Sequence, residues 1–146
     1  MRVNVPALAV AAAGAALLLC GAQDALAHHS FAAEFDASRP IELEGVVKEM
    51  RFTNPHSWIY VTVTTESGET QEWAIEGAAP NALLRRGFNR QSLPPGTEVR
   101  VRGYQARDRT LRAAGSDITL LEDGSKLFVG SPGTGAPEDI ERGGER

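Results

Sequence analysis

The sequence is poor in cysteine, in aromatic residues and in long apolar runs. Of its 146 residues one is a cysteine, Cys20, and it lies in an N-terminal segment that we expect to be removed. A mature chain without cysteine has neither a disulfide framework nor a thiol nucleophile. The apolar run from Ala7 to Leu19 is shorter than the roughly 20 residues that a membrane-spanning helix needs. We expect no membrane span after processing.

The sequence also lacks the motifs of the common enzyme classes. It contains no Ser-His-Asp or Cys-His arrangement, no phosphate-binding loop and no dinucleotide-binding glycine pattern. The carboxylates are plentiful, but no spacing singles out a catalytic pair. The net charge of −4 disfavours binding to a phosphate backbone. We therefore expect a non-enzymatic protein that does not bind nucleic acid.

The first 27 residues have the features of a secretory signal peptide. Arg2 supplies a positive charge before the apolar run, and Ala25-Leu26-Ala27 matches the small-x-small pattern read by signal peptidase. We predict cleavage after Ala27 and a periplasmic or secreted protein that begins at His28. The alternative, lipid attachment at Cys20, fits less well because Leu19 before it is not a small residue.

From residue 28 to residue 129 the sequence predicts one mainly β domain. Segments rich in β-branched and aromatic residues alternate with turn signals. The predicted strands cover residues 41–52, 58–65, 70–75, 99–104, 118–121 and 127–129. Pro80 and Gly87 predict the start and the end of a short helix. Residues 28–40 are expected to form an N-terminal arm, and residues 130–146 a disordered tail.

The order of these elements is typical of one small β fold. Three strands, a short helix and further strands follow one another as in an OB-fold barrel. Gly45 interrupts the alternation of the first strand, and a glycine at such a place often marks a bulge or a sharp bend. A bent first strand fits a barrel in which it serves both halves. We expect an OB-fold-like barrel of about five to six strands.

Three histidines carry the main site prediction. His28 and His29 would begin the mature chain, and His56 lies in the turn Asn54-Pro55-His56-Ser57. The free α-amine and the imidazole of His28 can together coordinate one metal ion, and a second imidazole completes a three-nitrogen histidine brace. We predict His56 as that second imidazole, with His29 as its rival. Copper is the preferred ion because Cu(II) favours tetragonal nitrogen ligation and leads the affinity order.

Other interpretations of these residues stay open. Glu34 or Asp36 could add an oxygen ligand. Two histidines at a cleavage site can also be a frayed polar terminus, and His56 can cap its turn by hydrogen bonding. In that case the domain is a metal-free adaptor for a small molecule, a peptide or an exported partner protein. Metal handling or delivery is the leading function, and oxidative copper chemistry is disfavoured because no extended substrate surface is evident.

Aromatic and basic residues offer weaker candidates. Trp58, Tyr60 and Trp73 could line a ligand groove, because OB barrels present aromatic side chains on their binding face. Packing in the core is the competing interpretation. Arg100 and Arg102 share one strand face and could receive an anion or an acidic partner, although a solvated outer face explains them more simply.

Several short motifs occur together between His28 and Phe128. They are His28-His29-Ser30-Phe31 after an alanine, Phe35-Asp36, Phe52-Thr53-Asn54-Pro55-His56-Ser57, Trp73, Pro80-Asn81-x-Leu83, Pro95-Gly96-x-x-Val99 and Gly103. In these motifs the sequence resembles a family of small exported bacterial proteins that is classed as a domain of unknown function. The resemblance implies an exported OB-like module. It implies no activity, so the copper prediction depends on the ligand chemistry alone.

Overall fold

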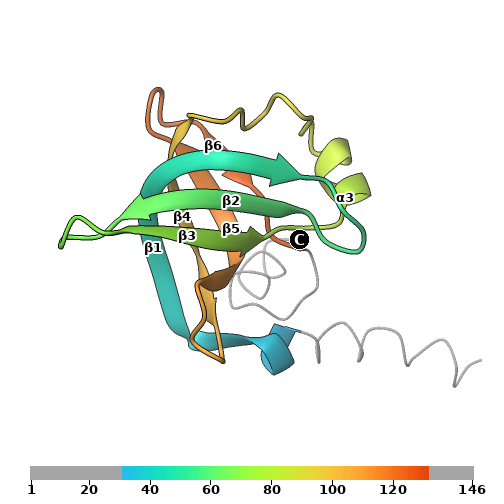
Figure 1. The fold of residues 1–146 in the computed structure, drawn as a ribbon. Helices are drawn as coiled ribbons and strands as arrows, with labels where there is room; N and C mark the ends of the chain where they lie inside the picture. The colour runs from blue at the N-terminus through green and yellow to red at the C-terminus, as the bar shows by residue number, and fades with distance from the viewer. Residues whose placement is uncertain (1–30, 132–146) are drawn as a thin grey trace, which may run out of the picture.

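Strands dominate residues 31–131, which are the residues that the computed structural model describes (Figure 1). The strands in this part of the chain are β1 (Phe35–Arg51), β2 (Trp58–Thr64), β3 (Thr70–Glu76), β4 (Glu98–Ala106), β5 (Arg112–Leu120) and β6 (Lys126–Phe128). The short helix α3 (Pro80–Arg85) stands between β3 and β4, and residues 31–34 form a further helical turn before β1. The predictions of a mainly β fold and of a short helix at this place are confirmed.

The strands form one sheet that closes on itself. Neighbours in the order β3-β2-β1-β4-β5-β6 pair in antiparallel fashion. In addition, β3 pairs with β5 in parallel, with Ala74 opposite Arg112 and Glu76 opposite Ala114. This last pairing closes a ring of β1, β2, β3, β5 and β4, and β6 extends it beside β5.

The first strand serves both halves of the ring. The 17 residues of β1 pair with β4 over residues 40–46 and with β2 over residues 46–51. The sequence predicts this strand from Ile41, but β1 begins at Phe35. Residues before Ile41 show no strand alternation, and their pairing with β4 is irregular between Phe35 and Pro40. Contact with β4 extends the strand where the local pattern does not.

A glycine allows β1 to turn from one partner to the other. A Cβ atom on Gly45 would lie 2.4 Å from the carbonyl oxygen of Thr62, which is too close for any other residue. The irregularity in pairing with β2 lies a little further along, between Val47 and Glu49. Gly45 therefore provides the close approach of the two strands, and the bulge follows it.

The first half of β5 departs from the prediction. The sequence predicts a strand only over residues 118–121, whereas β5 begins at Arg112. Residues 113–116 are alanine, glycine and serine, which have low strand propensity. The ring needs small residues here, because a Cβ atom on Gly115 would lie 2.7 Å from Cγ2 of Ile75. Pairing on both sides with β3 and β4 holds this segment extended.

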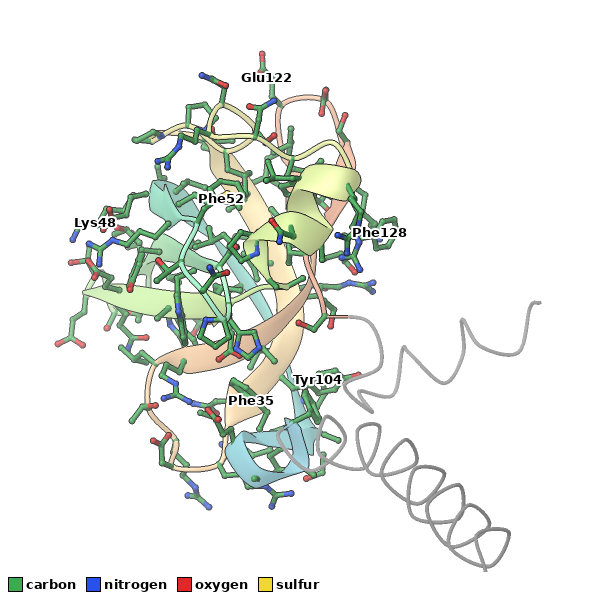
Figure 2. The ribbon with its side chains drawn as sticks, turned by 90° about the vertical axis from the view of Figure 1, so that its right-hand side faces the viewer. Phe35, Lys48, Phe52, Tyr104, Glu122 and Phe128 are labelled. Carbon is green, nitrogen blue, oxygen red and sulfur yellow. The ribbon has the colours of Figure 1, made fainter. Side chains whose placement is uncertain are left out.

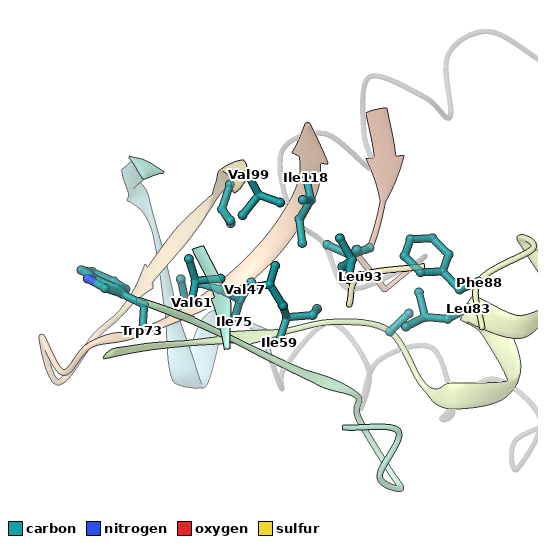
Figure 3. Close-up of a cluster of buried hydrophobic side chains, with 14 of the residues drawn as sticks. Val47, Ile59, Val61, Trp73, Ile75, Leu83, Phe88, Leu93, Val99 and Ile118 are labelled. Carbon is teal, nitrogen blue, oxygen red and sulfur yellow. The ribbon is translucent and has the colours of Figure 1, made fainter. Parts of the chain in front are cut away.

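Inward-facing side chains fill the interior of the ring (Figure 3). Figure 3 shows Trp73 at one end of this core, and Leu83 and Phe88 at the other. The side chains between them come from the strands and include Val47, Ile59, Val61, Ile75, Val99, Val101 and Ile118. Leu83 of α3, with Phe88 and Leu93 after it, thus covers one end of the core.

The described chain stays anchored up to its last residues. Arg86 donates from Nη1 to the carbonyl oxygens of Phe128 (3.1 Å) and Gly130 (2.7 Å). The predicted signal peptide, and the predicted tail beyond residue 131, lie outside the described residues. Between residues 31 and 131, neither helical segment has the length and apolar character that crossing a bilayer requires.

Candidate functional site

His56 lies in the turn that leads into β2, and the backbone around it is tied to the chain after β3. The amide of Ser57 donates to the carbonyl of Ala78 (3.1 Å), and the amide of Gly77 donates to the carbonyl of Ser57 (2.8 Å). The β2–β3 hydrogen bonding therefore continues past both strands as far as the turn. The Asn54–Pro55 peptide bond in this turn is cis. The hydrogen bonds of Ser57 to Ala78 and Gly77 give the backbone next to His56 a defined position.

The His56 ring contacts the carboxylate of Glu76. Nδ1 of His56 lies 2.5 Å from Oε1 of Glu76, and 39% of the histidine side chain is exposed against 13% of the glutamate side chain. Glu76 ends β3 and pairs with Trp58 of β2. Trp58 and Glu76 are paired and therefore share one face of the sheet, and the contact with Glu76 places the His56 ring at the same face. The contact occupies Nδ1, so Nε2 is the ring nitrogen available to a ligand.

Arg112 links this pair to the beginning of the described chain. Its Nη2 donates to Oε2 of Glu34 (3.0 Å). Its guanidinium carbon lies 5.8 Å from the ring centre of Phe35 and 6.0 Å from that of Trp58. Arg112 opens β5 next to the end of β3, so the parallel pairing that closes the ring also brings its charge towards Glu76.

The electrostatics of Glu76 reflect this crowded environment. Burial raises the pKa of the Glu76 carboxyl above its ordinary value of 4.5. Electrostatic attraction to His56 and to Arg112 lowers the pKa of Glu76, and the negative charge of Glu34 raises it. Desolvation is the largest of these influences. The site therefore holds a half-exposed imidazole in front of a mostly buried carboxyl.

The start of the described chain packs beside this site. Phe31 is 7% exposed, and its ring centre lies 5.7 Å from that of Phe35 and 5.8 Å from that of Tyr104. Figure 2 shows Phe35 and Tyr104 close together, at the end of the domain away from Glu122. Phe35 contacts both Phe31 and the Arg112 guanidinium, so this aromatic cluster adjoins the charged one.

Hydrogen bonds add to this anchoring. Arg107 donates from Nε to the carbonyl oxygen of Ala32 (2.6 Å) and from its amide to that of Glu34 (2.9 Å). Together with the Arg112–Glu34 pair, these bonds fix residues 32–34 against the loop between β4 and β5. Figure 1 shows that loop beside the helical turn at the start of β1.

Of the other predicted metal ligands, the structure describes Asp36 and Glu34, and both already have partners. His28 and His29 lie outside the described residues. Asp36 accepts hydrogen bonds from the amide (3.0 Å) and the hydroxyl (2.7 Å) of Ser38, which lower its pKa below 3.8, and Glu34 is engaged by Arg112. Within residues 31–131, no three His, Cys, Asp or Glu side chains gather in a way that could hold a metal ion.

The three candidate groove aromatics do not share a face. Trp73 is 7% exposed, belongs to the core and pairs with Val61, another buried residue. Trp58 and Tyr60 are half-buried and alternate with the inward-facing residues of β2, so they lie on its outer side. Arg51 stacks 4.9 Å from the ring centre of Tyr60. Of the three, Trp58 is the one that contacts Arg112.

Arg100 and Arg102 share a face of β4, as the sequence predicts, but each holds a carboxylate. Arg100 donates to Oε1 of Glu44 from Nε (2.8 Å) and Nη2 (2.6 Å). Arg102 donates to both carboxylate oxygens of Asp117, the closest contact being Nη2 to Oδ2 at 2.6 Å. In this structure, both arginine side chains are therefore engaged in ion pairs within the chain.

Glu76 is the site residue that the sequence analysis missed. The signal was present in the hairpin: a turn at residues 65–69 sets Trp58 opposite Glu76 and therefore brings Glu76 next to His56. Extending the predicted register by one residue beyond Ile75 would have found it. The position of Arg112 follows from the parallel pairing of β3 with β5, which no local pattern indicates.

A comparison with protein families gives a match over most of the chain. The model of a family described as a family of unknown function (DUF6152) matches residues 13–115. The matched segment includes all three histidines, Glu76 and Arg112. A search of curated proteins gave no match.

Proposed function

The chain belongs to DUF6152, a family of unknown function, and we propose that it is an exported, non-enzymatic OB-fold module that binds one Cu(II) ion through His28 and His56. On this proposal its role is metal handling or delivery to an exported partner. The observation that carries it is that Glu34 and Phe35, at the anchored start of the described chain, contact Arg112. The charge of Arg112 acts on Glu76, which contacts His56.

The closed ring supports the OB-fold part of the proposal. The order of three strands, a short helix and two further strands, in a sheet that closes on itself, supports this assignment. In OB-folds the loops between strands 1 and 2 and between strands 4 and 5 border the ligand site. Here the first of these loops carries His56, and Arg112 follows the second.

Chain reach supports the pairing of His28 with His56. Phe31 is buried next to Phe35, which in turn contacts Arg112. Three residues span at most about 10 Å when extended, so His28 can lie no further than that from Phe31 along the chain. Arg112 contacts Phe35 and Glu34, its charge acts on Glu76, and Glu76 contacts His56. A short extended segment can therefore bring His28 towards Nε2 of His56.

The donor set fits copper better than other ions. After cleavage following Ala27, His28 would offer an amine and an imidazole, and His56 offers a half-exposed imidazole. Three nitrogens without a thiolate suit Cu(II), which prefers tetragonal nitrogen ligation and heads the affinity series. In the described residues the nearby carboxylates are already engaged by His56 and Arg112, so they would tune the charge around the ion.

Copper binding by the processed chain tests the proposal. Protein that begins at His28 should take up one Cu(II), with an EPR spectrum that shows nitrogen ligation. His56→Ala and a chain with one extra alanine before His28 should both lose most of the affinity. His29→Ala separates the two candidate imidazoles, because it should bind copper as the wild type does.

Two results would overturn the proposal. One is equal copper affinity with and without the extra alanine, because the free amine would then play no part. The other is unchanged affinity in His56→Ala. Mass spectrometry of the N-terminus of the native protein, with elemental analysis of the same sample, tests the export and the metal together. A processed protein with no bound metal and no copper affinity would instead favour a metal-free adaptor.

A further inference from the structure

Glu76 stands directly behind the one described imidazole of the proposed copper site. We propose that Glu76 is a positioning residue: it accepts a hydrogen bond from Nδ1–H of His56, holds the ring in that tautomer, and so leaves Nε2 as the ligating nitrogen. The ligand part of this inference rests on the proposed function. The tautomer part stands without it and is testable in metal-free protein.

The geometry assigns the proton to Nδ1. Oε1 of Glu76 lies 2.5 Å from Nδ1 of His56, within hydrogen-bonding distance. A neutral imidazole carries one N–H, and an ionised carboxylate can only accept. With the ring neutral and the carboxyl ionised, the contact therefore places the N–H on Nδ1 and the free lone pair on Nε2. Since 39% of the His56 side chain is exposed, a ligand can reach that nitrogen.

The fold holds both partners in place. Glu76 is paired with Trp58, and the backbone bonds between Ser57 and Gly77 continue that register to the turn of His56. The Glu76 side chain is 13% exposed, so it has little freedom to turn away. Metal-bound histidines commonly donate their second N–H to such a carboxylate, which fixes the ring orientation and raises its basicity.

Arg112 and Glu34 complete the surroundings of this carboxylate. Arg112 acts on both acids: its Nη2 lies 3.0 Å from Oε2 of Glu34, and its positive charge lowers the pKa of Glu76. Glu34 is therefore engaged by Arg112, whereas Glu76 contacts His56. The carboxylates thus supply orientation and charge, while the ligating atoms remain nitrogens.

The first experiment measures the His56 tautomer in metal-free protein. Nitrogen-15 chemical shifts of the imidazole, recorded about two pH units above the ordinary histidine pKa of about 6.5, distinguish Nδ1–H from Nε2–H. We expect Nδ1–H in the wild type and in Glu76→Gln, whose amide oxygen can still accept. Glu76→Ala should shift towards Nε2–H. An Nε2–H ring in the folded wild type would overturn the inference, even where Glu76→Ala fails to fold.

The second experiment measures copper affinity in chains that begin at His28. Loss of a carboxylate behind a ligating histidine typically costs 10–100-fold in affinity, so we expect about that loss in Glu76→Ala and a smaller one in Glu76→Gln. Glu72→Ala is the matched control, because Glu72 lies on the same strand but pairs with Lys48 at the exposed surface. It should bind copper as the wild type does. Unchanged affinity in Glu76→Ala would overturn the role of Glu76 in ligation.

The two experiments separate the inference from the proposed function. If His56→Ala binds copper normally while His56 keeps its Nδ1–H tautomer, the copper assignment to Nε2 is overturned and the contact with Glu76 stands. If copper binding depends on His56 but the free ring is protonated on Nε2, the proposed function stands and the positioning role is overturned.

Discussion

Replacing Arg102 by methionine should destabilise the fold far more than the same change at Arg100. Both arginines extend from the same face of β4 and hold a carboxylate. The partner of Arg102, Asp117, is 2% exposed, whereas Glu44, the partner of Arg100, is 56% exposed. The comparison therefore isolates the effect of burial on an ion pair.

The expected magnitude follows from what the substitution leaves behind. Asp117 accepts from Arg102 at 3.2 Å to each oxygen from Nε and at 2.6 Å from Nη2. Removing one partner of a buried pair typically costs 3–5 kcal/mol, because a charge stays buried without compensation. Lys126 remains 3.8 Å from Asp117, so we expect the lower end, about 3 kcal/mol. Arg100→Met should cost far less, because an ion pair at the exposed surface contributes little to stability.

Urea unfolding followed by tryptophan fluorescence measures both losses of stability. The signal reports unfolding because Trp73 is buried in the core and Trp58 is half-buried, and both become exposed when the chain unfolds. The double variant Arg102→Met/Asp117→Leu should recover most of the loss, because removing both charges removes the buried unpaired one. Equal losses in Arg102→Met and Arg100→Met would refute the reasoning. So would a double variant less stable than Arg102→Met.

Three further outcomes are expected. Gly103→Ala should lower the free energy of unfolding by about 1–3 kcal/mol or prevent folding, because its Cβ would lie 2.0 Å from the carbonyl oxygen of Ala114; urea unfolding checks this. Ile75→Ala, at a fully buried core position, should cost about 2–5 kcal/mol in the same assay. Hydrogen bonds from Thr110 lower the pKa of Asp108 below 3.8, so its contribution to stability is present above that pH and is lost as the pH falls through the lower folded-state pKa. Asp108→Asn should therefore flatten the pH dependence of stability in that acidic range.

The sequence predicts best the strands in which buried and half-buried side chains alternate regularly. In β2 and β3, buried and half-buried positions alternate, so the period-2 pattern of Ile59, Val61 and Val63 can be recognised in the sequence itself. The start and stop of α3 are likewise local, set by Pro80 and by Gly87 with its φ of +87°. Each of these features depends on residues close in sequence.

The first halves of β1 and β5 could not be predicted in this way. Residues 113–116 are too small to show strand propensity, and they are extended because β3 and β4 pair with them on both sides. Phe35 is a strand residue because β4 lies beside it, despite an irregular stretch that follows. In both cases contacts distant in sequence override a weak local preference.

The sequence by itself determined the elements that need only their own residues: the alternating strands, the turns, the short helix and the small set of histidines that could bind a metal. The tertiary structure decided which side chains meet. Closing the ring through β3 and β5 brought Arg112 near Glu76, and the hairpin register brought Glu76 to His56. Such encounters depend on pairing between segments far apart in the chain, and the free energy of that pairing comes from the whole core rather than from any one stretch of sequence.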